Sequence, residues 1–116
     1  GAQVDIGNFL CVDENPVTAV SRLAPFAKYV HVKDFHVKSG SEFPPQDGFF
    51  KTRGGNYLRG AVLGHGNVPV LQTLEILKGA GYNGWITLEF EGHEEAKQAC
   101  KWGLNTLKKI CECLEW

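Results

Sequence analysis

The chain has 116 residues, enough for one domain with a hydrophobic core. Its hydrophobic fraction of 43% is typical of a globular protein, and its net charge of −1 leaves no basic excess of the kind that nucleic-acid-binding proteins carry. No apolar run approaches the roughly 20 residues that cross a bilayer, and no signal peptide is recognisable. We therefore expect a cytoplasmic protein whose partners include neither nucleic acid nor a membrane.

The first part of the chain predicts a strand, a helix and a second strand. Val4 and Ile6 alternate with Asp5 in AQVDIGNFL, as in a strand with one buried face. A helix follows in DENPVTAVSRLAPFA, where Asn15 is a favourable N-cap residue and a proline takes the first helical position. The second strand is YVHVKDF, residues 29–35, which is rich in β-branched and aromatic side chains.

The remainder predicts a long loop, a helix, a third strand and a final helix. Residues 37–66 are rich in glycine and contain proline, which is typical of a loop. The segment NVPVLQTLEILKGAG predicts a helix with Leu71, Leu74 and Leu77 facing inward and a glycine at its end. GWITLEFEG, residues 84–92, predicts the third strand, and EEAKQACKWGLNTLKKICECLEW predicts a long amphipathic helix.

Each predicted strand has one apolar face and one face that carries an ionisable side chain. In the second strand, Val30 and Val32 point away from His31 and Lys33, because successive strand side chains alternate between faces. The first strand sets Asp5 against its apolar neighbours in the same way. The third strand has Ile86, Leu88 and Phe90 on one face and Trp85, Thr87, Glu89 and Glu91 on the other.

This asymmetry favours a β/α barrel over a doubly wound sheet. A doubly wound sheet buries both faces of its strands, which then read as continuous apolar runs. In a barrel the outer strand face meets the helices, and the inner face turns polar near the C-terminal mouth, where active sites lie. A complete barrel has eight strands and about 250 residues. We therefore predict an α/β fold of three β/α units with parallel strands and outer helices. These units would be strands six to eight of a partial (β/α)8 TIM barrel, with residues 1–116 as its C-terminal fragment.

Three ionisable side chains occupy matching heights on the three strands. Asp5, His31 and Glu89 would converge on one cavity at the mouth of the barrel. Two carboxylates and an imidazole form a suitable ligand shell for one divalent metal, and Mn²⁺, Mg²⁺, Co²⁺ and Zn²⁺ all accept these ligand types. Taken singly, each residue also suits a structural role, as a hydrogen-bonded core histidine or a turn carboxylate. Their matched positions predict a metal site at Asp5, His31 and Glu89.

The motifs of the chain resemble those of the sugar phosphate isomerase/epimerase family, which belongs to the xylose-isomerase-like TIM barrels. DIGNF, HVKDFH, LGHGNVPV and GYNGWITLEFEG occur in the order of the C-terminal portion of that family. Its members hold one divalent metal between a Glu, an Asp, a His and a Glu from the ends of different strands. The resemblance assigns the Asp to Asp5, the His to His31 and the final Glu to Glu89. The first Glu, which is usually also an acid/base group, has no counterpart in this sequence.

The resemblance implies a metal-dependent sugar or sugar phosphate isomerase or epimerase. In such enzymes the metal polarises the sugar carbonyl, and one Glu removes the proton alpha to it. The resulting enediolate receives a proton from a second Glu on its opposite face. Glu89 would then be both a metal ligand and a catalytic acid/base group. Because the other Glu is missing, we expect the parent protein to be an enzyme and the isolated chain to be inactive.

Four further residues are candidates for binding the substrate. Lys33 shares a face with His31 and is placed either to contact a substrate oxygen or to form a salt bridge with Glu91. Asn8 stands where related epimerases carry a substrate-binding side chain, often a His. His65 lies in a glycine turn before a helix, a position that suits an anion or a sugar hydroxyl as well as an exposed loop. Arg59, with Arg53, lies in a glycine-rich run that could bind a phosphate or remain solvated.

Other functions stay open. An inosose dehydratase-like lyase is similar through the HxKD strand and the Glu-rich last strand, and a non-catalytic binding or interaction module would bind metal without turnover. Barrel DNA-repair endonucleases need additional zinc ligands where Gly60 and Ala61 stand, so the sequence disfavours them. Three strands cannot close a barrel, and we expect self-association through the open edges.

The four cysteines predict buried thiols. None of them forms a CxxC pair, and Cys100 and Cys111 fall on an apolar stripe of the last helix with Leu104, Leu107 and Leu114. A disulfide or a metal site is the alternative for Cys11, Cys100, Cys111 and Cys113. A reducing compartment suits buried thiols best.

Overall fold

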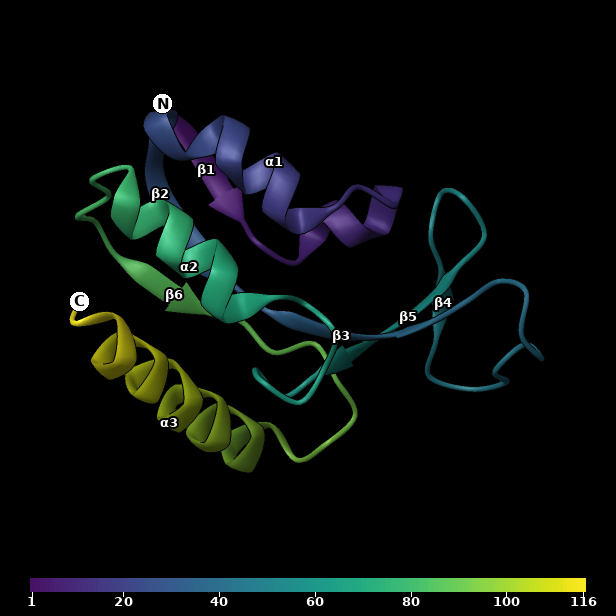
Figure 1. The fold of residues 1–116 in the computed structure, drawn as a ribbon. Helices are drawn as coiled ribbons and strands as arrows, with labels where there is room; N and C mark the ends of the chain where they lie inside the picture. Colours follow the sequence, from purple (N-terminus) through teal and green to yellow (C-terminus); the bar gives the residue numbers. More distant parts are fainter.

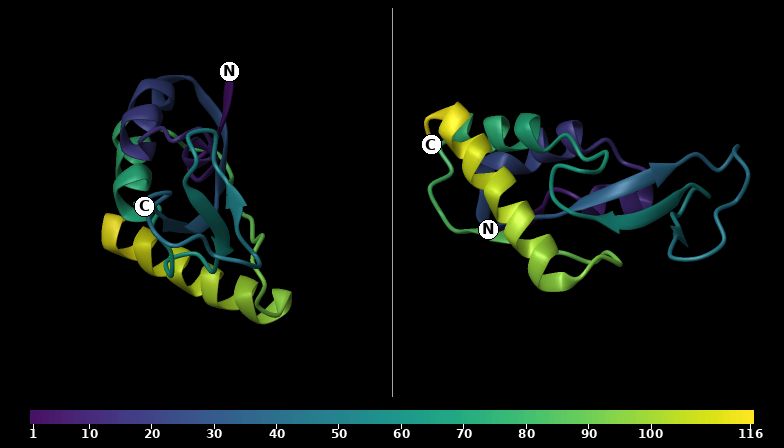
Figure 2. Two further views of the ribbon diagram at one scale, coloured as in Figure 1. Left: turned by 90° about the vertical axis from the view of Figure 1, so that its right-hand side faces the viewer. Right: turned by 90° about the horizontal axis from the view of Figure 1, so that it is seen from below.

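The computed structural model describes residues 1–116, and its parallel strands and helices alternate as expected. The parallel sheet has the order β1-β2-β6, formed by Ala2–Asp5, Ala27–Val32 and Ile86–Leu88. The helices are α1 (Pro16–Leu23), α2 (Val70–Gly79) and α3 (Ala96–Leu114), and all three lie on one side of this sheet (Figures 1 and 2). Two short 3₁₀ helices, η1 (Asn8–Val12) and η2 (Ala24–Phe26), flank α1. An α/β fold with a parallel sheet and helices is thus confirmed.

Local sequence explains where the helices begin and end. Asn15 caps α1, because its Oδ1 accepts hydrogen bonds from the backbone N–H groups of Val17 (2.9 Å) and Thr18 (3.3 Å). Glu95 caps α3 in the same manner through its carboxylate. Helix α2 ends just before Gly81, whose φ of +83° lies in the left-handed region that favours glycine.

The hydrophobic core lies between the parallel sheet and the helices. Val4, Val30 and Val32 are fully buried on the helix-facing side of the strands, together with Leu74 and Leu77 of α2. The predicted division of the strand faces is therefore confirmed for β1 and β2, whereas Ile86 and Leu88 of β6 are only partly buried. Packing of these residues anchors the strands against the helices. The polar side chains on the opposite strand face are thereby held in fixed positions.

Two helix faces differ from the prediction. Leu71 is 48% exposed, because α2 begins at Val70 and buries the positions of Val70, Thr73, Leu74 and Leu77. In α3 the buried positions are Ala99, Gly103 and Leu107, which form a helical repeat rotated away from Cys100 and Leu104. Cys100 and Cys113 are exposed, and Cys11 and Cys111 are only partly buried, so the prediction of buried thiols is wrong. All four cysteines are free thiols.

The predicted second strand and the long loop after it are the largest corrections. The strand leaves the parallel sheet at Lys33, and β3 (Asp34–Lys38) enters a second, antiparallel sheet with the order β3-β5-β4. Its other members, β5 (Tyr57–Ala61) and β4 (Phe50–Lys51), lie within the segment that the glycines had suggested was a loop. This sheet extends beyond the C-terminal ends of the parallel strands (Figure 1).

The antiparallel sheet has an apolar face and a polar face. Phe35 and Leu58 are buried, and the ring of Phe35 packs edge-on against Phe50 with centroids 5.9 Å apart. The register pairs His36 with Arg59, so both side chains lie on the opposite face. The sheet therefore folds because long-range pairing of apolar side chains outweighs the loop-forming tendency of its glycines. No helix of the structure is both long and apolar enough to cross a membrane.

Candidate metal centre

The three predicted metal ligands come together at the C-terminal ends of the parallel strands. Asp5 ends β1 and is the register partner of His31 in β2, and Glu89 follows directly after β6. The N–H of Glu89 donates to the carbonyl of Val32 at 2.9 Å, which extends the β2–β6 pairing to this residue. One ligand atom from each of the three side chains lies within 4.8 Å of the others, and each residue is half-buried. The convergence that the strand pattern predicted is present, and metal binding itself stays a prediction.

Lys33 lies in the middle of this group. Its Nζ lies 2.7 Å from Glu89 Oε2, 2.8 Å from Glu91 Oε1 and 3.2 Å from Asp5 Oδ2, and the residue is 5% exposed. Burial on its own lowers the pKa of Lys33, but the hydrogen bonds to Glu89 and Glu91 and the charge of Asp5 raise that pKa above its ordinary value. These three carboxylates therefore favour the charged ammonium form of the side chain. The salt bridge to Glu91 that the sequence suggested is one of three.

The imidazole of His31 is held from both sides. Its Nδ1 lies 2.5 Å from Glu89 Oε1, and its Nε2 lies 3.4 Å from the amide nitrogen of Gln3. Tyr29 packs edge-on against the imidazole with centroids 5.0 Å apart, and its hydroxyl lies 2.6 Å from the Thr87 hydroxyl oxygen. Gln3, Tyr29 and Thr87 thus form a polar layer just below the three ligands. Sequence reasoning missed this layer, although its members are the inward-facing residues two positions from the ligands.

The pKa of Glu89 is lowered. The hydrogen bond from Lys33 is the largest cause, the hydrogen bond from His31 adds to it, and partial burial opposes both. The carboxylate is therefore ionised and can accept the Nδ1–H of His31. An ionised carboxylate is the form that either binds a cation or accepts a proton.

The carboxylate of Asp5 is fixed by the turn that follows β1. Its Oδ1 accepts hydrogen bonds from the backbone N–H groups of Gly7 (3.0 Å) and Asn8 (3.2 Å). A Cβ at Gly7 would collide with the Lys33 side chain, so a glycine is required where these two segments meet. Asn8 thus adjoins the centre through its backbone, whereas its side chain is exposed, and a substrate contact from that side chain remains a prediction.

The other predicted substrate-binding residues do not contact the centre. The ring of His65 faces Trp102 of α3, with centroids 6.1 Å apart. Arg59 points from the polar face of the antiparallel sheet to Glu94, where Nη2 and Oε1 are 3.3 Å apart. Arg53 is exposed, and its backbone N–H donates to the carbonyl of Cys11. His65 and Arg59 thus have partners on α3 and on the segment before it, and a substrate contact from either side chain remains a prediction.

Asp34 is a structural residue that the sequence did not single out. It is 2% exposed, and its two oxygens accept hydrogen bonds from four backbone N–H groups at 2.8–3.0 Å, those of Phe35, Gly64, Gly66 and Val68. The carboxylate therefore ties the end of β2 to the turn that leads into α2. The only signal in the sequence is an Asp directly after a strand together with a glycine turn about thirty residues later, and the four donors are backbone groups that no residue pattern reveals.

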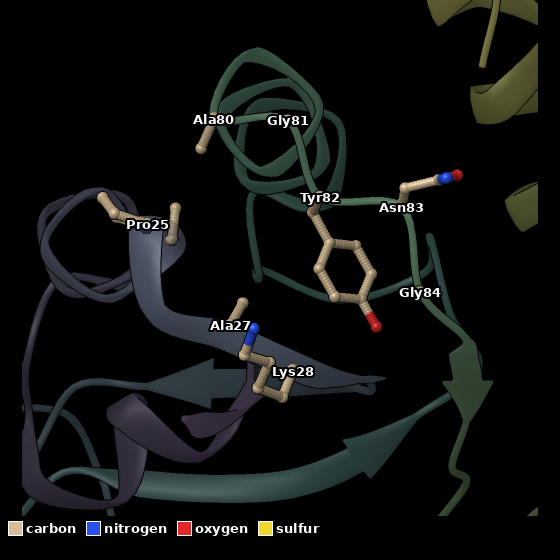
Figure 3. Close-up of a pocket in the computed structure, with 9 residues that line it drawn as sticks. Pro25, Ala27, Lys28, Ala80, Gly81, Tyr82, Asn83 and Gly84 are labelled. Atoms are coloured by element: carbon tan, nitrogen blue, oxygen red, sulfur yellow. The ribbon is translucent and has the colours of Figure 1, made fainter.

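A separate cavity of about 350 Å³ lies near the opposite ends of the strands. Figure 3 shows it between the start of β2 and the turn after α2, with the ring of Tyr82 extending from that turn beside Gly84. The Tyr82 hydroxyl donates to the carbonyl of Trp85 at 2.6 Å. This cavity shares no residue with the metal centre and holds no cluster of ionisable groups.

The donor set of the centre suits a divalent cation. Asp5, His31 and Glu89 offer oxygen and nitrogen ligands from three different strands, and the surrounding hydrogen bonds from Gly7, Asn8 and Gln3 orient them. Oriented ligands of this kind are typical of metal sites in proteins, in which outer partners fix the position of each ligand. Three protein ligands would also leave coordination positions for a substrate.

Comparison with known proteins agrees with this architecture. The family model described as xylose isomerase-like TIM barrel matches residues 1–110. A xylose isomerase domain protein from Planctomyces limnophilus is structurally similar with a TM-score of 0.73 and 23% identity, over 99% of this chain and 37% of that one. A xylose isomerase domain protein from Alicyclobacillus acidocaldarius subsp. acidocaldarius has a TM-score of 0.64 and 21% identity, over 100% of this chain and 38% of that one.

The chain spans less than two fifths of the length of either structure. No curated protein sequence matches it. The family match covers almost the whole chain and coincides with the parallel sheet, the outer helices and the polar strand ends described above. The chain therefore belongs to the xylose isomerase-like TIM-barrel family.

Proposed function

We propose that this chain carries part of the active centre of a metal-dependent sugar or sugar phosphate isomerase or epimerase. The observation that supports this most directly is the convergence of Asp5, His31 and Glu89 within 4.8 Å at the C-terminal ends of parallel strands. In this proposal β1, β2 and β6 correspond to strands six to eight of a (β/α)8 barrel, and residues 1–116 to its C-terminal portion. Active sites of such barrels lie at that end of the strands.

The proposed ligands are Asp5, His31 and Glu89, with Mn²⁺, Mg²⁺, Co²⁺ or Zn²⁺ as the metal. The metal would supply Lewis-acid polarisation of the sugar carbonyl. Glu89 has an ionised carboxylate and would accept the proton alpha to that carbonyl. The ammonium of Lys33 would contact a negatively charged substrate oxygen, and Asn8 would border the same space.

Proton transfer on both faces of a planar intermediate needs two acid/base groups. The chain offers Glu89 on one face, and the carboxylate expected from an earlier strand has no counterpart in the sequence. We therefore propose that the chain by itself exchanges a substrate proton at most and completes no epimerisation. A chain that binds metal and catalyses neither step would instead be a binding module.

Metal binding tests the proposed centre. Titration calorimetry with Mn²⁺ and with Zn²⁺ is expected to show one site per chain and a large loss of affinity in His31→Ala. His36→Ala is the matched control, because His36 lies on the antiparallel sheet outside the centre. Metal binding with equal affinity in the native chain and in His31→Ala would overturn the proposed ligand set.

Proton exchange tests the proposed chemistry. A panel of ketoses and their phosphates is incubated in D₂O with the metal-loaded chain, and deuterium at the carbon alpha to the carbonyl is followed by NMR. Exchange that disappears in Glu89→Gln while epimer formation stays undetectable is the expected result. Exchange that persists undiminished in Glu89→Gln would exclude Glu89 as the base.

A further inference from the structure

Every carboxylate oxygen of the proposed ligands already has a partner within the chain. Asp5 Oδ1 accepts two backbone N–H groups, and Asp5 Oδ2 faces Lys33 Nζ at 3.2 Å. Glu89 Oε1 faces His31 Nδ1, and Glu89 Oε2 faces Lys33 Nζ at 2.7 Å. The Lys33 ammonium is therefore the partner of one oxygen from each carboxylate, Asp5 Oδ2 and Glu89 Oε2.

The position of this ammonium places it in competition with a cation. Lys33 is 5% exposed and cannot move freely into solvent. A divalent cation on Asp5 and Glu89 would share their oxygens with an ammonium at contact distance. Repulsion between two cations is strong where water is largely excluded. The present contacts of Lys33 and an occupied metal site are therefore in conflict.

Glu91 offers the ammonium another position. It lies two residues beyond Glu89 and approaches Lys33 Nζ from the rim, with Oε1 at 2.8 Å. Its side chain is 56% exposed, and it lies outside the cluster of three ligands. A small displacement toward Glu91 would release Asp5 and Glu89 while Lys33 keeps one carboxylate partner.

We propose that Lys33 is an internal counter-ion that competes with the metal for Asp5 and Glu89, and that Glu91 receives its ammonium when the metal binds. This inference rests on the proposed metal site. It assigns Lys33 and Glu91 the role of positioning residues that set the affinity of the centre for cations and keep its carboxylates neutralised before the metal arrives.

Calorimetric titration of the native chain and four variants tests this exchange, with Mn²⁺ as the probe. Lys33→Met keeps an unbranched side chain that is one atom shorter and removes the competing ammonium, so affinity is expected to rise by about tenfold or more. Glu91→Gln removes the carboxylate that would receive the Lys33 ammonium, so the affinity for Mn²⁺ is expected to fall several-fold. The double variant Lys33→Met/Glu91→Gln is expected to bind as tightly as Lys33→Met alone. Lys38→Met, on the antiparallel sheet, is the matched lysine control and should leave affinity unchanged.

The double variant separates two explanations of the Glu91→Gln result. If Glu91 acted only as a nearby negative charge, its loss would weaken binding equally with and without Lys33. If it acts through Lys33, its effect vanishes once Lys33 is absent, which a double-mutant cycle measures directly. An effect of Glu91→Gln that is the same in both backgrounds, or a Lys33→Met variant without higher affinity than the native chain, would overturn the exchange.

A second readout does not depend on a substitution of Lys33. The ¹³Cε signal of Lys33 is expected to shift when Zn²⁺ is added to the labelled native chain, and no other lysine should respond. A metal-loaded chain with an unmoved Lys33 signal would refute the displacement even if Lys33→Met failed to fold. Absence of metal binding in the native chain and in Lys33→Met together would overturn the proposed metal site itself, a different outcome from binding that Lys33 does not influence.

Discussion

Replacing Asp34 with alanine removes the acceptor for four backbone N–H groups at once. Two of the hydrogen bonds, from Phe35 and Val68, are buried, and the other two, from Gly64 and Gly66, are partly buried. Water can reach the partly buried donors once the carboxylate is gone, whereas the buried ones lose their partners outright. A buried donor left unsatisfied costs about 1–3 kcal/mol. The two buried donors therefore put the expected loss of unfolding free energy near 4 kcal/mol.

Such a loss is a large fraction of the roughly 5–15 kcal/mol that stabilises a typical domain. Urea unfolding, followed by tryptophan fluorescence and circular dichroism, measures it. Asp34→Asn keeps one acceptor oxygen and turns an amide NH₂ toward the other donors, so it should be destabilised by an intermediate amount. Asp47→Ala is the matched control, because Asp47 is exposed. A change below about 1 kcal/mol in Asp34→Ala would refute the view that this carboxylate holds the turn before α2.

Three further predictions concern two turns of the chain and the end of α2. The hydrogen bond from Thr52, with others from Asn56 and Gly54, lowers the pKa of Asp13, so this carboxylate stabilises the fold above its unfolded pKa of about 3.9. That stabilisation should be lost as the pH falls through the folded pKa, and urea midpoints of the native chain and Asp13→Asn should converge between about pH 4 and pH 2; a constant difference would contradict this. Gly66→Ala should destabilise the chain by about 1–3 kcal/mol, because a Cβ there would collide with Asp34 and with the backbone of Phe35. Gly79→Ala, where a Cβ meets nothing, should instead stabilise α2 by up to about 1 kcal/mol, and thermal unfolding of both variants compares the signs.

The sequence predicted the parallel strands because their pattern is local. Alternation of Val30 and Val32 with His31 and Lys33 needs only the two-residue period of a strand, and it also fixes the face on which the ionisable groups stand. The cap at Asn15 is equally local, since the side chain bonds to N–H groups two and three residues away. These local patterns predict the structure correctly because they do not depend on contacts with distant parts of the chain.

The antiparallel sheet could not be predicted in that way. Its glycines and prolines are typical of a loop. Its strands form because β3 pairs with β5, about twenty residues later in the chain, and because Phe35 packs against Phe50. The spacing of Leu71 with Leu74 and Leu77 fits a helix and predicts that Leu71 is buried. Leu71 instead lies in the first turn of α2 and is exposed. Periodicity in the sequence predicts that a helix has an apolar side. The way the helix packs determines which residues of that side face the core.

Residue order alone predicts an aspartate, a histidine and a glutamate at one level of three parallel strands. The position of Lys33 between them, and the bonds by which Asp34 holds the adjoining turn, are visible only in the folded chain. Strand period repeats along the backbone and therefore leaves a pattern in residue order. The partners of a buried ammonium or carboxylate are distant side chains and backbone donors, which are brought together only when the chain folds.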